Sequence, residues 1–62
     1  MKLLSTFTSA DKTRKSTVSF VDEQTYAVEF FHKDKLSSYA YYDTAQHADS
    51  AAEEFIIQVD SK

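Results

Sequence analysis

The 62-residue chain contains no glycine, proline, cysteine or tryptophan. Without cysteine it can form no disulfide and has no thiolate for catalysis or metal binding. Without glycine it cannot build the phosphate-binding loops of P-loop and dinucleotide-binding enzymes, because those turns need backbone conformations that other residues avoid. These absences exclude thiol chemistry and the common nucleotide-binding enzyme classes.

A chain of this length forms one small domain, which buries only about 60% of the surface that the unfolded chain exposes. Such domains commonly gain stability from disulfides, a metal ion or a partner subunit. Since cysteine is absent, we expect self-association. The apolar run at Met1–Leu4 is too short for an export signal, and no segment approaches the length of a membrane span. We therefore expect a cytoplasmic protein without a membrane partner.

Most of residues 17–42 are expected to form β-strands. Apolar and polar residues alternate there, as they do in strands, over three segments: 17–21, 25–32 and 36–42. Residues 1–16 are expected to hold an edge strand or arm, followed by a polar, basic loop. The last strand has two possible registers. Leu36, Ala40 and Tyr42 form one face, Tyr39 and Tyr41 form the other, and either face could pack inward.

The turn at residues 33–35 has no glycine to supply a positive φ. Asp34 is the residue there that best tolerates a positive φ, because its short polar side chain can hydrogen-bond locally. We therefore expect Asp34 in the left-handed region.

A helix is predicted over residues 43–59, where one stripe of apolar residues recurs at steps of three and four: Ala45, Ala48, Ala52, Phe55, Ile56 and Val59. Ile57 falls opposite this stripe. Asp43 fits the N-cap position, and Gln46 follows three residues later as in a capping box. The sequence thus predicts an α+β fold, a three-stranded antiparallel meander with a possible fourth N-terminal edge strand and one C-terminal helix on one face.

The two imidazoles, His32 and His47, are the obvious metal ligands, but the sequence does not bring them together with carboxylates such as Asp34, Asp43 or Asp49. Glu53 and Glu54 are adjacent on the predicted helix and so point about 100° apart, as residues on a solvated face do. We expect no metal, no cofactor and no catalytic residue, and hence a protein that is not an enzyme.

Large apolar residues outnumber those that one sheet face and one helix can cover. Some must lie on the surface, where clustered aromatic side chains mark contact sites. We expect the uncovered sheet face to bind protein, either a second copy in a homodimer or another protein, through five residues: Val21, Phe31, Tyr39, Tyr41 and Tyr42.

The alternative is a nucleic-acid-binding module that uses Lys12, Arg14 and Lys15. The stretch 42–48, Tyr-Asp-Thr-Ala-Gln-His-Ala, resembles the strand-to-helix junction of the ethylene-response and integrase arm-type DNA-binding domains. That resemblance implies a sheet that reads the major groove through arginine and tryptophan. The chain has no tryptophan, no arginine after Arg14 and a net charge of -3, so nucleic acid is the less favoured partner.

Over nearly its whole length the chain resembles small accessory proteins of marine cyanophages. The resemblance rests on Lys2-Leu3-Leu4 with Thr6-Phe7-Thr8, on residues 28–31 and on the tyrosine-rich strand before an alanine-rich helix. It implies an accessory phage protein in the host cytoplasm, with a host protein as a partner. It supplies no active site.

Overall fold

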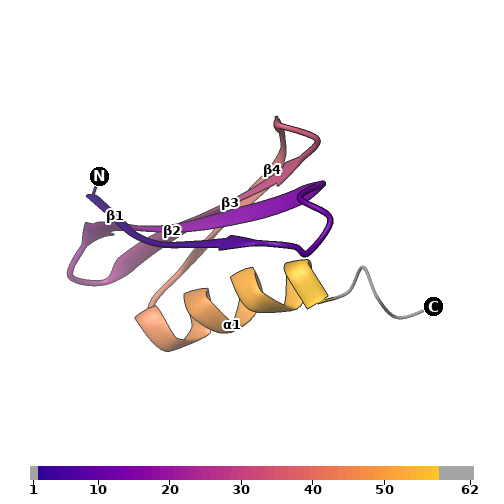
Figure 1. The fold of residues 1–62 in the computed structure, drawn as a ribbon. Coiled ribbons are helices and arrows are strands. Elements are labelled where there is room, and N and C mark those ends of the chain that lie inside the picture. The colour runs from indigo at the N-terminus through magenta and orange to yellow at the C-terminus, as the bar shows by residue number, and fades with distance from the viewer. Residues whose placement is uncertain (1, 58–62) are drawn as a thin grey trace.

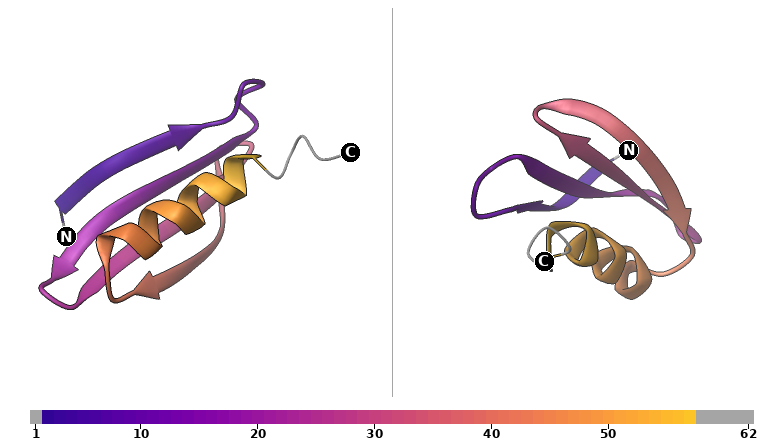
Figure 2. Two further views of the ribbon diagram at one scale, coloured as in Figure 1. Left: turned by 90° about the horizontal axis from the view of Figure 1, so that it is seen from below. Right: turned by 90° about the vertical axis from the view of Figure 1, so that its right-hand side faces the viewer.

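The computed structural model describes residues 2–57. They form four strands and one helix: β1 (Lys2–Thr8), β2 (Arg14–Asp22), β3 (Thr25–His32), β4 (Lys35–Tyr42) and α1 (Ala45–Ile57). The strands are antiparallel and lie side by side in chain order, and α1 crosses one face of the sheet (Figures 1 and 2). The predicted α+β fold is confirmed, and the N-terminal segment is a full edge strand of a four-stranded sheet.

β2 begins at Arg14, earlier than the expected start at Thr17. Arg14, Lys15 and Ser16 pair with residues 30–32 of β3, which gives their backbone groups hydrogen-bond partners that a loop would lack. The connection between β1 and β2 is therefore residues 9–13 alone. Because side chains alternate along a strand, consecutive basic residues now point to opposite faces.

The 9–13 connection is organised by Asp11. Its Oδ1 accepts hydrogen bonds from the backbone N–H of Thr13 at 3.0 Å, the hydroxyl of Ser9 at 2.8 Å and the hydroxyl of Thr13 at 2.8 Å. These donors favour the ionised carboxylate and lower the pKa of Asp11 to about 2. The next residue, Lys12, has a φ of 65°, so a residue other than glycine adopts the left-handed conformation in this turn.

The β3–β4 turn is built by Lys33 and Asp34, with φ angles of 53° and 69°. Positive φ at both central residues is the pattern of a type I′ hairpin turn, which matches the twist of the flanking strands. The predicted positive φ at Asp34 is confirmed, and Lys33 has a positive φ as well. The N–H of Lys33 also donates to the carbonyl of Thr13 at 2.7 Å, which joins the two turns at this end of the sheet.

The core lies between the sheet and α1, which packs chiefly over β2 and β3. Four side chains form its centre, and four larger ones are half-buried around them: Val18, Val28, Ala48 and Ala52, then Phe7, Tyr26, Phe30 and Tyr42. The two alanines let the helix approach closely. The helix-facing side of β2 therefore includes Val18, and that of β3 includes Tyr26, Val28 and Phe30.

Thr44, not Asp43, caps the helix, because its Oγ1 accepts the N–H of His47 at 3.2 Å. The helix therefore begins at Ala45. Asp43 lies one residue further out, where its Oδ1 is 3.6 Å from Nδ1 of His47 on the exposed surface. The prediction that Asp43 is the N-cap is therefore wrong, and the threonine hydroxyl accepts the hydrogen bond instead.

The apolar stripe of α1 is confirmed at its centre and corrected at its start. Ala48 and Ala52 are fully buried and Phe55 packs on Phe30, with ring centroids 4.9 Å apart. Ile57 is 61% exposed, as its phase predicts. Ala45 is exposed, because the helix starts beyond the edge of the core. Val59 lies outside the described residues.

The register of β4 shifts between Phe30 and Phe31, so Leu36 pairs with Phe31 while Ser38 pairs with Phe30. The extra residue interrupts the alternation between Leu36 and Ala40. Leu36 therefore lies on the opposite face from Ala40 and Tyr42, contrary to the simple alternation that the sequence indicated.

Candidate functional site

Within residues 2–57 no element covers the sheet face opposite α1, which we call the exposed face (Figure 2). Strand pairing sets its side chains in three rows that each run from β1 to β4: Leu3–Ser19–Ala27–Tyr41, Thr6–Thr17–Glu29–Tyr39 and Thr8–Lys15–Phe31–Leu36. The rows divide the face into two halves. The β1 and β2 half carries mainly hydroxyl groups, and the β3 and β4 half carries the aromatic rings.

The aromatic half carries three of the seven exposed large apolar residues in the part of the chain that the structure describes. Leu36, Tyr39 and Tyr41 are 53%, 62% and 62% exposed. The two tyrosine rings meet edge to face with centroids 5.7 Å apart. Together with Glu29 they border a hollow of about 180 Å³ whose floor includes the small side chain of Ala27. A flat apolar strip with a shallow socket can accept a protruding side chain of another protein.

The structure brings together most of the residues predicted for partner binding. Phe31, Tyr39 and Tyr41 all lie on the exposed face. Val21 is the extra residue of a bulge at the end of β2, and its exposed side chain lies at the edge of this face. The prediction that Tyr42 lies on the uncovered face is wrong, because Tyr42 pairs with Tyr26 on the helix side and packs against the core.

The three predicted basic residues do not form one patch. Lys12 lies in the turn, and Lys15 lies on the exposed face with its Nζ 5.2 Å from the centre of the Phe31 ring. Arg14 points to the helix side. Its guanidinium lies 5.2 Å above the Phe55 ring, and its Nη1 donates to the Phe55 carbonyl at 3.4 Å. Arg14 therefore holds the end of α1 to the sheet.

Sequence reasoning missed two further cations beside them. The hydrogen bond between Lys33 and Thr13 joins the β1–β2 and β3–β4 turns, so Lys33 and Lys35 lie at the same end of the sheet as Lys12 and Lys15. The signal was available, because alternate turns of any antiparallel meander lie at the same end. We call this region the basic end.

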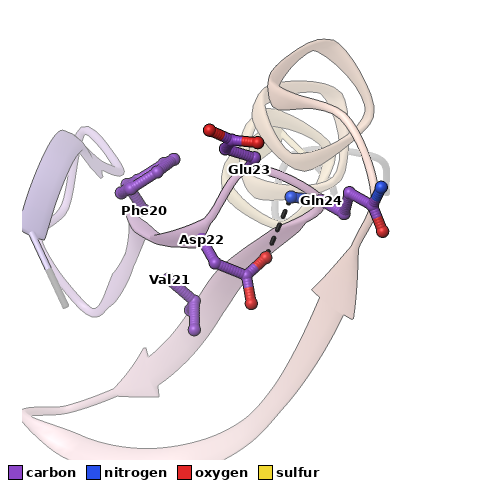
Figure 3. A pocket seen from close by; sticks show the side chains of 5 residues that line it. All are labelled: Phe20, Val21, Asp22, Glu23 and Gln24. Carbon is purple, nitrogen blue, oxygen red and sulfur yellow. Dashed lines mark hydrogen bonds between the residues drawn. The ribbon is translucent and has the colours of Figure 1, made fainter.

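A wider hollow lies at the opposite end, at the β2–β3 turn (Figure 3). It is an open depression of about 550 Å³ formed by residues 20–24. Phe20 and Val21 point away from each other, and Asp22 Oδ1 accepts the N–H of Gln24 at 2.9 Å. The Asp22 carboxylate thus stabilises the turn, and the lining residues include no imidazole or nucleophile to pair with it.

The histidines lie apart. His32 pairs with Arg14 at the basic end, whereas His47 lies in the first turn of α1. Among residues 2–57 no three histidine, aspartate or glutamate side chains converge on a common point that could hold a metal ion. The same residues contain no helix long and apolar enough to cross a membrane.

Comparison with known proteins found no match among family models, curated proteins or solved structures.

Proposed function

We propose that the protein is a non-enzymatic protein-interaction module whose contact surface is the exposed face. One observation carries this proposal: Leu36, Tyr39 and Tyr41 are neighbours on β4, and more than half of each side chain is exposed. Clustered large apolar groups mark contact surfaces, and tyrosine is enriched in them because it combines apolar area with a polar tip.

The size of the face is sufficient for a specific contact. Four strands about 4.8 Å apart, paired over about 20 Å, present roughly 400 Å² in projection. Two surfaces of this size bury on the order of 1,000 Å² of accessible area, which is the lower limit for a specific interface. The partner is a second copy of the chain or, as the phage resemblance implies, a protein of the host cytoplasm.

The second candidate function is binding of single-stranded nucleic acid. It is favoured by the basic end, where Lys33 and Lys35 join Lys12 and Lys15, and by the position of Lys15 over an aromatic ring. Glu29 at the centre of the exposed face and the net charge of -3 oppose it, because phosphate attraction dominates nucleic-acid affinity.

Site-specific photocross-linking tests the proposed function. A photoreactive phenylalanine analogue replaces Tyr41 on the exposed face, and a matched variant carries it at Ser50, an exposed residue of α1. We expect discrete adducts with protein, either the chain itself or a host protein, from position 41 only. Equal adduct patterns from both positions, or no protein adduct from position 41, would contradict the proposal.

A further inference from the structure

The two ends of the sheet carry opposite charge. The β1–β2 and β3–β4 turns lie together at the basic end, and the β2–β3 turn and the start of α1 lie at the other (Figure 1). On the strands and turns, the basic end holds five cationic side chains and two acidic ones: Lys12, Arg14, Lys15, Lys33 and Lys35, with Asp11 and Asp34. Glu53 and Glu54 lie near this end too, but on α1, across the sheet from the exposed face. The other end, which we call the acidic end, holds three acidic side chains and one cationic one: Asp22, Glu23 and Asp43, with Lys2.

Two copies can pack face to face about one of two kinds of two-fold axis in the plane of contact. An axis parallel to the strands places β4 over β1 and brings like-charged ends together. An axis perpendicular to the strands places β4 over β4 and brings the basic end of each copy over the acidic end of the other. Charge complementarity therefore selects the perpendicular axis.

The distribution of apolar groups selects the same axis independently. The perpendicular axis packs each aromatic half on the other, whereas the parallel axis would set Tyr39 and Tyr41 against Thr6 and Leu3 of the hydroxyl half. Burying aromatic area against aromatic area removes more apolar surface from water.

Side-chain sizes also match under the perpendicular axis when it passes near the middle row. The first row of one copy then lies over the third row of the other, so Phe31 of the second copy faces the hollow at Ala27. A large side chain meets a small one, as close packing requires. The middle rows then lie over each other, so Glu29 of one copy faces Glu29 of the other across the axis. Lys15 of each copy lies over Ser19 of the other, diagonally adjacent to Glu29, which gives both carboxylates a cationic neighbour.

We infer that the exposed face is occupied by a second copy of this chain, in an antiparallel two-fold dimer whose axis runs perpendicular to the strands. This inference rests on the proposed function and names its partner. In this dimer the basic ends of the two copies are far apart, and so are their acidic ends.

Spin-label distances test the arrangement, and the absence of cysteine makes single labels unambiguous. One variant carries Ala10→Cys in the β1–β2 turn, and the other carries Glu23→Cys in the β2–β3 turn; both residues are exposed. Eight residues of strand span about 26 Å and packed sheets lie about 10 Å apart. If the dimer is antiparallel, a sample of either variant alone should give label-to-label distances above about 25 Å. An equal mixture of the two variants also contains mixed dimers, whose two labels should be about 10–20 Å apart.

Short separations in each single-variant sample, to which the mixture adds only long ones, would identify the parallel axis and overturn the inference. Sedimentation velocity on the unlabelled chain accompanies the measurement, with twice the 7.1 kDa chain mass as the expected species at high micromolar concentration. A chain that stays monomeric there overturns the second copy as partner. Cross-linking from position 41 to a host protein would in that case still support the proposed function, so the two failures can be told apart.

Discussion

The hydroxyl of Ser16 in β2 donates a 2.9 Å hydrogen bond to the carbonyl oxygen of Ala52, in the middle of α1. Ser16 is fully buried, and so is Ala52. This bond is a polar contact inside an otherwise apolar layer, and it joins the middle of α1 to β2. No local pattern predicted this hydrogen bond, because Ser16 was expected in a loop.

Replacing Ser16 with alanine should lower the free energy of unfolding by roughly 0.5–1.5 kcal/mol, the usual net contribution of one hydrogen bond. The effect stays modest because the Ala52 carbonyl keeps its helical partner. Urea unfolding of the variant measures the change. Ser38→Ala in β4, where the side chain is exposed, is the control and should stay within about 0.5 kcal/mol of the wild type. Equal effects at both serines would contradict a role for the buried bond.

The β3–β4 turn should be open to stabilisation, because Lys33 and Asp34 both adopt positive φ. Left-handed backbone costs roughly 1–2 kcal/mol per ordinary residue, and Asn-Gly is the pair that tolerates it best. The double variant Lys33→Asn, Asp34→Gly should therefore raise the unfolding free energy by about 1 kcal/mol. Thermal and urea unfolding measure the gain.

The β2–β3 turn supplies the matched control. Glu23 and Gln24 also occupy a two-residue turn, but neither has a positive φ. Asn-Gly at these two positions should leave stability unchanged or lower it, since glycine there only increases the freedom of the unfolded chain. A similar gain at both turns would show that backbone strain is not the cause.

The stability of the β1–β2 turn should depend on pH through Asp11. Its pKa in the folded state is about 2, below the ordinary value of 3.8, so its stabilising effect is complete above the ordinary value. The effect is lost as the pH falls from about 4 to about 2. Carboxyl titration by NMR should give a midpoint near 2 for Asp11. In Thr13→Val, which removes one hydroxyl donor to Oδ1, the midpoint should move upward.

An Asp11 midpoint at the ordinary value in the wild type would show that the hydrogen bonds from Ser9 and Thr13 are not formed in solution. The variant Asp11→Asn gives a second measurement. Its stability deficit relative to the wild type should shrink as the pH is lowered through this window, because the wild-type carboxylate becomes protonated.

Binding of single-stranded oligonucleotides decides between the two candidate functions. If Lys12, Lys15, Lys33 and Lys35 all contact phosphate, the log–log salt slope would be only about -3, at roughly -0.7 per contact. We expect no binding tighter than roughly 10 μM at about 150 mM salt. Fluorescence anisotropy measures the affinity. Submicromolar binding that is abolished when these four lysines become alanine would favour the nucleic-acid function.

Local patterns in the sequence determined the elements and most of their faces. The two-residue period set Val28 and Phe30 on one face of their strand, and the three- and four-residue steps separated Ala48 and Ala52 from Ile57. In a turn without glycine, the short polar side chain of Asp34 favoured that residue for the positive φ. These features were predictable because each depends on residues that are close in the chain.

Tertiary pairing alone decided where the basic residues point. Nothing local distinguishes Arg14 and Lys15 in a loop from the same residues in a strand, but pairing with β3 extends β2 through them. The strand then sends Arg14 to the end of α1 and Lys15 to the exposed face. A strand end depends on its neighbour's hydrogen bonds, which are contributed by residues far along the chain.

The composition of the exposed face was decided in the same way. The sequence left the register of β4 open, and the shift beside Phe31 put Leu36 with Tyr39 and Tyr41 while it turned Tyr42 into the core. A one-residue change in pairing moves side chains to the opposite face, and in the observed register Tyr42 packs against the core. Sequence determined that aromatic residues would be left over, and packing determined which ones.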